Sequence, residues 1–227
     1  RVALLISFPV HMTAWVAPLP IVAAAAPGPI AGFLITLKGM QPAFDTVASA
    51  SLLGFAKTEL SRGVDLAQSL LHAPIQGWYG SRAGSLGETA TWLIAGGGVA
   101  MIFLRTITWH IPLAMLLGIA IPAAILNAID PARYMEASTH LLSGGAMLGA
   151  FFIATDYVTS PNTTRGQLVF GAGCGVLTYV IRTWAGYPEG VAFAVLLMNS
   201  LTPIIDSYIR PRIYGRNRQG VALEPGK

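Results

Sequence analysis

The run WHIPLAMLLGIAIPAAILN, Trp109–Asn127, decides the fold class of this chain. It contains no lysine, arginine, aspartate or glutamate, and as a helix it is long enough to cross the roughly 30 Å hydrocarbon core of a membrane. Backbone at membrane depth must satisfy its own hydrogen bonds, which only helices and closed barrels achieve. Because the run is uniformly apolar and lacks the alternating pattern of a barrel strand, it predicts a transmembrane helix.

Four further stretches have a similar length and the same content of small and aliphatic residues, and we predict that each also spans the membrane. They are Leu86–Leu104, Ser138–Thr155, Gly166–Trp184 and Val191–Ile209. The whole chain of 227 residues is 54% hydrophobic and 11% charged, whereas a soluble domain usually carries about 25% charged residues. The predicted fold class is therefore all-α, a polytopic transmembrane helix bundle with a long external loop region, and a soluble enzyme domain is excluded.

The arginines between the predicted spans give the bundle an orientation, because loops rich in lysine and arginine stay in the cytoplasm. Counting loops places Arg133 and Arg182 outside, and it places a larger group inside: Arg105, Arg165, Arg210, Arg212, Arg216 and Arg218. The tail 210–227 is therefore predicted to be basic and cytoplasmic. Because successive loops alternate between the two sides of the membrane, residues 11–85 are predicted to form an external, periplasmic segment. Residues 1–10 are predicted to form the end of a truncated transmembrane helix.

Ionisable side chains near the span ends are the candidates for chemistry, because such groups are costly in lipid and usually functional. They are Glu88, His140, Asp156, Arg182, Glu189 and Asp206. Glu88 and Asp156 have two evenly weighted interpretations. Each carboxylate either serves ion passage or cofactor tuning, or is simply solvated at the membrane interface. For Glu189 and Asp206 solvation is favoured. Cys174 is interpreted as a packing residue, and the sequence indicates neither a metal site nor an acid–base catalytic residue.

Several glycines lie within the predicted spans, at Gly96–Gly98, Gly144–Gly145, Gly149, and positions 171, 173 and 175. Small residues let membrane helices approach closely, so close helix packing is the favoured interpretation of all of them. A dinucleotide-binding loop is not indicated at 171–175, because no βαβ pattern surrounds it.

Several runs carry a family resemblance. They are SGGAMLGAFFIATD (143–156), RGQLVFG (165–171), GYPEGVAFAVLLMN (186–199) and PIID (203–206), with ISFP (6–9) and GSLGET (84–89) in the first half. Together they closely resemble the D subunit of the Rnf electron-transport complex, whose relative is the B subunit of the Na⁺-translocating NADH:quinone reductase. The resemblance covers essentially the whole chain, and it implies further membrane helices before residue 1.

The resemblance also implies an FMN esterified through its phosphate to a threonine hydroxyl, and it puts the acceptor position at Ser51 in this chain. Serine offers the same nucleophilic oxygen. Lys57, Arg62 and Arg82 are then candidates to compensate the phosphate charge. From the residues alone, the favoured interpretation of Ser51 is an ordinary N-cap of a short helix over Leu52–Leu60, and a phosphate at the same helix start is compatible with that helix.

The function implied by the resemblance is a flavin-carrying subunit of an ion-translocating ferredoxin:NAD⁺ oxidoreductase in the bacterial inner membrane. Its partners would be membrane lipid and the other membrane and peripheral subunits, and a second, noncovalent riboflavin is implied. Na⁺ and H⁺ both stay open as the coupling ion. The alternatives are a secondary transporter or channel subunit without flavin and a cofactor-free scaffold. Because the basic residues form no broad stripe, nucleic acid is not an expected partner.

The orientation can be tested with reporter fusions. A reporter that is active only in the periplasm should be inactive when fused after Arg218, because the basic tail is held in the cytoplasm. The same reporter fused after Arg133 should be active. Periplasmic activity after Arg218 would reverse the predicted orientation.

Overall fold

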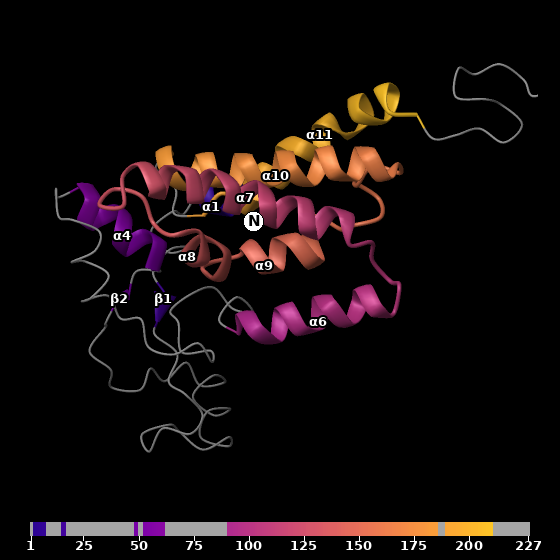
Figure 1. Cartoon of the computed structure of the whole chain (residues 1–227). Coiled ribbons are helices and arrows are strands. Elements are labelled where there is room, and N and C mark those ends of the chain that lie inside the picture. The colour runs from indigo at the N-terminus through magenta and orange to yellow at the C-terminus, as the bar shows by residue number, and fades with distance from the viewer. Residues whose placement is uncertain are drawn as a thin grey trace, which may run out of the picture.

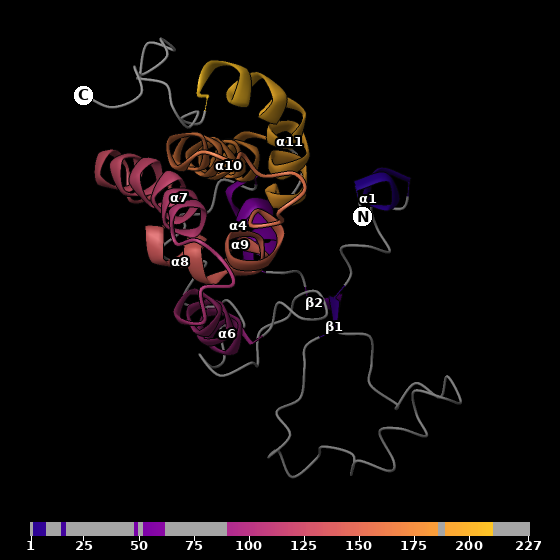
Figure 2. The ribbon, with the colours of Figure 1, turned by 90° about the vertical axis from the view of Figure 1, so that its right-hand side faces the viewer.

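The computed structural model describes residues 2–7, 15–16, 48–49, 52–61, 90–185 and 189–210. The helices are α1 (Val2–Ser7), α4 (Leu52–Ser61), α6 (Thr91–Phe103), α7 (His110–Ile129), α8 (Ala137–Leu142), α9 (Ala146–Leu148), a π-helical turn η1 (Gly149–Ile153), α10 (Thr164–Trp184) and α11 (Val191–Tyr208). Two short strands, β1 (Trp15–Val16) and β2 (Ala48–Ser49), pair antiparallel. In Figure 1 the long helices run across the view side by side, and Figure 2 shows them end-on.

Two of the described helices, α7 and α11, are long and apolar enough to cross a membrane. They match the predicted spans Trp109–Asn127 and Val191–Ile209 to within two residues at each end. Helix α10 covers the predicted span Gly166–Trp184, and α6 is a shorter apolar helix inside Leu86–Leu104. Helical structure with two candidate membrane spans is thereby confirmed for this part of the chain.

Helices α7 and α10 pack at backbone contact distance because glycines lie between them. A Cβ on Gly175 would stand 2.3 Å from the carbonyl oxygen of Met115 and 2.8 Å from the Cα of Gly118. One turn earlier, a Cβ on Gly171 would stand 2.7 Å from the carbonyl oxygen of Ile111. Residues four apart share one helix face, so the two α10 glycines form the small-xxx-small pattern of membrane helices. The predicted close packing is confirmed for them.

The apolar core lies among α7, η1, α10 and α11, which surround Met115, Phe170 and Cys174. Helix α6 reaches this core through Gly98, where a Cβ would stand 2.3 Å from the ring of Phe151. Large apolar side chains also point outward, most regularly on α7, where the exposed residues recur every four positions: Leu113, Leu117, Ile121 and Ile125. An apolar outer face suits a lipid environment, where apolar exposure has no cost.

The predicted span Ser138–Thr155 is wrong as one continuous helix. Helix α8 ends at Leu142, Ser143 has extended backbone, and Gly144 has a φ of +62°. This left-handed conformation is strained for side-chain-bearing residues and readily adopted by glycine. The pair Gly144–Gly145, predicted to serve close helix packing, therefore breaks the segment before α9 begins at Ala146.

The close contact between α7 and α10 predicts a clear difference between two glycine substitutions. Gly175→Ala should lower the free energy of unfolding by about 2 kcal/mol or more, because its methyl group would overlap backbone that cannot move aside. Gly96→Ala is the matched control, since a Cβ there meets nothing within 4 Å. Thermal unfolding of both variants in detergent measures the difference. Equal stability would rule out the backbone contact.

Candidate functional site

The break between α8 and α9 leaves carbonyl groups that need donors from elsewhere, because the last four carbonyls of a helix have no partner within it. Arg182 at the end of α10 supplies two of these donors. Its Nη1 donates to the His140 carbonyl at 2.6 Å, and its Nη2 donates to the Ser143 carbonyl at 3.0 Å. The hydroxyl of Thr91, at the start of α6, donates to the Leu142 carbonyl at 3.2 Å. Two neighbouring helices therefore cap the break.

Arg182 is only 2% exposed, although arginine is rarely buried unless its donors are used. The planar guanidinium matches this place, because its donors diverge in a fixed fork that can reach two carbonyls at once. The carboxylate of Glu189 also lies beside the break. A Cβ built on Gly144 would stand 2.7 Å from Glu189 Oε1 and 3.1 Å from Arg182 Nη2. Arg182 therefore belongs to the interior of the bundle. The arginine count placed this residue at the external end of a predicted span, and the structure buries it at that end of α10.

Other polar side chains gather around the same break. His140 and Tyr179 are both almost fully buried, and their rings meet edge to face with centroids 5.1 Å apart. Ser143 is buried beside them. The atoms His140 Nδ1, Ser143 Oγ and Tyr179 Oη have no hydrogen-bond partner among the described residues. Within the part of the chain that is described, this end of the bundle thus concentrates buried polar groups that lie far apart in the sequence.

Helix α4 lies at the same end of the bundle, on the left in Figure 1. Its Leu53 and Ala56 are buried and pack with Met135, in the connection between α7 and α8. The Nζ of Lys57 donates to the carbonyl oxygen of Ala185, the residue directly after α10. Burial lowers the pKa of the Lys57 ammonium below its ordinary value, and the nearby Arg182 guanidinium lowers this pKa further.

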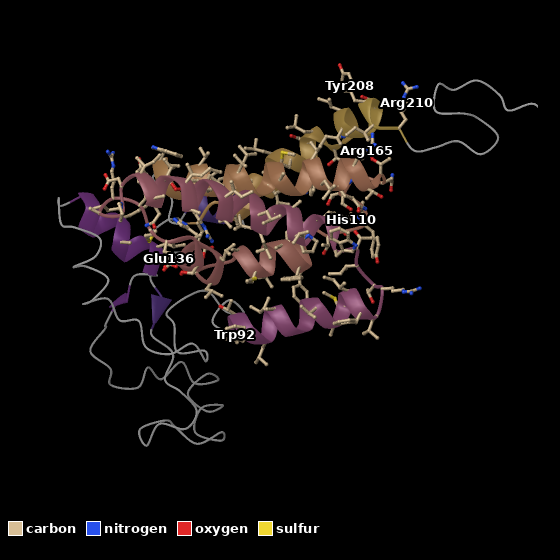
Figure 3. All side chains as sticks on the ribbon, viewed as in Figure 1. Trp92, His110, Glu136, Arg165, Tyr208 and Arg210 are labelled. Atoms are coloured by element: carbon tan, nitrogen blue, oxygen red, sulfur yellow. The ribbon has the colours of Figure 1, made fainter. Side chains whose placement is uncertain are left out.

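The structure separates the predicted site residues that it describes. Lys57 lies beside the end of α10, whereas Asp156 lies before its start, exposed to solvent, and accepts a hydrogen bond from Thr159 Oγ1 at 3.2 Å. The 21 residues of α10 separate the two ends by about 30 Å. In Figure 3 the labelled residues Arg165, on the right, and Glu136, on the left, mark these two ends. The remaining predicted residues fall outside the described ranges: Ser51, Arg62, Arg82 and Glu88.

The sequence includes Arg182 and His140 among the ionisable candidates near the span ends, but it does not predict that the two residues meet in one polar site. One signal was available, namely an arginine inside an otherwise apolar helical run, since such residues usually face the bundle interior. The partner of Arg182 gave no signal of its own, because backbone carbonyls carry no sequence information. Only the fold brings residue 182 to residues 140 and 143.

Comparison with known proteins gives a consistent family. The model of the NQR2, RnfD, RnfE family matches residues 1–215. The chain is 48% identical to the D subunit of the ion-translocating oxidoreductase complex of Halorhodospira halophila, over 98% of this chain and 63% of that protein. It is 50% identical to the protein of the same name from Stutzerimonas stutzeri, over 100% of this chain and 64% of that protein. The chain thus spans slightly less than two thirds of the length of these relatives.

The cap on the helix break predicts a large effect of a single side chain. Arg182→Met should lower the free energy of unfolding by about 3 kcal/mol, because two buried carbonyls lose a charged donor. Arg182→Lys should recover part of this loss, since an ammonium lacks the fork that reaches both carbonyls. Arg165→Met is the control, because Arg165 is exposed at the opposite end. If Arg182→Met and Arg165→Met unfold at the same temperature in detergent, Arg182 does not hold the break.

Proposed function

This chain belongs to the NQR2, RnfD, RnfE family, and we propose that it is the flavin-carrying membrane subunit of an Rnf-type, ion-translocating ferredoxin:NAD⁺ oxidoreductase. The observation that carries the proposal is the family match over residues 1–215, together with relatives named as the D subunit of an ion-translocating oxidoreductase complex. The other membrane and peripheral subunits of such a complex are its proposed partners. Its proposed location is the bacterial inner membrane, with a cytoplasmic C-terminus.

The proposed flavin is an FMN joined through its phosphate to the hydroxyl of Ser51. Ser51 directly precedes α4, which begins at Leu52. The backbone N–H groups in the first turn of a helix favour a negative phosphate, so the start of this helix suits such a group. Lys57 and Arg182 add positive charge to the same end of the bundle. The residues present therefore fit a phosphate-linked flavin, with Arg62 and Arg82 as further proposed partners of the phosphate.

A bound flavin would supply electron transfer, and the protein would supply its position and its shielding from water. Leu53 and Ala56 hold α4 against Met135 through buried apolar contacts. Lys57 adds a directional contact to the end of α10. No described side chain is required to move a proton for this role. A second, noncovalent riboflavin also belongs to the proposal, without ligands assigned to it.

Ion passage, of Na⁺ or H⁺, is the other part of the proposed function. Asp156 is exposed near the predicted cytoplasmic ends of α10 and η1. This position suits an entry point for cations better than the tuning of a flavin about one helix length away. Glu88 remains a candidate at the opposite end, where the sequence places it shortly before α6.

A secondary transporter or channel subunit without flavin is the second candidate function, and the interrupted segment α8–α9 favours it. Discontinuous helices with exposed carbonyl groups form solute and ion sites in many transporters. In this chain, however, Arg182 and Thr91 occupy several of the freed carbonyls. The absorbance spectrum of the purified complex separates the two functions, because only the first requires a flavin.

The flavin attachment is tested on a denaturing gel viewed for flavin fluorescence. The wild-type band should fluoresce, Ser51→Thr should retain the signal, and Ser51→Ala should lose it, because alanine has no hydroxyl to form the phosphodiester. Fluorescence retained in Ser51→Ala would place the bond on another hydroxyl. A dark wild-type band beside a bright Ser51→Thr band would mean that serine is not accepted for attachment.

A further inference from the structure

Helix α4 packs against the bundle through one face that combines apolar side chains with a lysine. Leu53, Ala56, Lys57 and Leu60 follow the spacing i, i+3, i+4, i+7, which brings them onto a single helix face. Leu53 is 2% exposed and Ala56 is 1% exposed, and Leu60 packs against the same cluster. Lys57 is thus a cation on the packed face of α4 rather than a residue that points to solvent.

The hydrogen-bond acceptor of Lys57 lies at the end of a helix. Ala185 caps α10, and its own N–H is bonded to the Ile181 carbonyl. Its carbonyl oxygen lies at the C-terminal end of a long helix, which carries partial negative charge. The half-buried Lys57 ammonium donates to this oxygen. Since burial strengthens such a contact and increases the cost of losing it, this hydrogen bond is more than a solvated surface interaction.

One helix end therefore holds two other segments in place. Arg182 fixes the break between α8 and α9, and three residues later Ala185 accepts the hydrogen bond from α4. Apolar burial is not directional, so Leu53 and Ala56 define the register of α4 less sharply than a hydrogen bond does. The Lys57 contact adds the direction that fixes one register.

We propose that Lys57 is a positioning residue, which fixes the segment carrying Ser51 in register with the end of α10 and thereby holds the attached flavin in one place. This inference rests on the proposed function, since it concerns the flavin on Ser51. It assigns Lys57 to a contact with the protein backbone, where the sequence had suggested compensation of the phosphate. Because Ser51 directly precedes α4, any displacement of α4 moves the flavin attachment.

The test compares wild type, Lys57→Met, Lys57→Arg and Arg165→Met in the purified complex with the full-length chain. Methionine keeps an unbranched apolar chain without a donor, and arginine keeps the donor. Arg165→Met removes the same charge at the other end of the bundle. Three properties are measured: covalent flavin on a denaturing gel, quenching of flavin fluorescence by acrylamide, and the unfolding midpoint. Acrylamide is neutral, so a lost charge does not change its local concentration.

We expect Lys57→Met to keep its covalent flavin and to lower its unfolding midpoint by about 2–4 °C at most. Its population of undocked α4 should rise about fivefold, as the net strength of one hydrogen bond implies, and acrylamide quenching should increase accordingly. Lys57→Arg should restore the wild-type quenching, and Arg165→Met should not differ from wild type. Normal flavin attachment with unchanged quenching in Lys57→Met would overturn this inference alone. A wild type without covalent flavin would overturn the inference and the proposed attachment together.

Discussion

The carbonyl groups freed at the break between α8 and α9 set the main constraint on this structure. In a membrane setting, buried carbonyls cannot turn to water, so the protein must provide donors for them. Arg182 provides two and Thr91 provides a third. These contacts tie α6, α8 and α10 together at one end of the bundle. A glycine in the left-handed conformation, a buried guanidinium and two separate helices are all consequences of interrupting one apolar segment.

The rest of the fold gives this constraint a rigid support. Glycines at 171 and 175 bring α10 against the backbone of α7, so the helix that carries Arg182 cannot easily shift along its neighbour. The same end of α10 receives Lys57 from α4. The segment proposed to carry the flavin and the interrupted segment are therefore both attached to one element. This arrangement suits a redox protein in which the cofactor must keep a fixed place relative to the membrane helices.

The sequence predicted those parts of the fold that depend on composition alone. Helices α7 and α11 were found because their runs are long and uniformly apolar, which is sufficient to predict a span. The interruption at Gly144 was missed because a glycine pair serves close packing and helix breaks equally well, and the choice depends on distant donors. The place of Arg182 in the bundle interior was missed for the same reason, since its acceptors are backbone atoms about forty positions away. Ser51 came from family resemblance, whereas the contact of Lys57 with Ala185 required the fold.

We claim above all that the segment proposed to bear the flavin and the Arg182-capped break lie at one end of the same helix bundle. A cryo-EM map of the complete complex tests it most directly, at a resolution that shows side chains. We expect guanidinium density against the carbonyls of residues 140 and 143, and flavin density continuous with Ser51 beside the end of α10. A continuous helix through residues 143–145, with Arg182 turned away from it, would contradict the claim. Flavin density at the opposite end of α10, near Asp156, would contradict it equally.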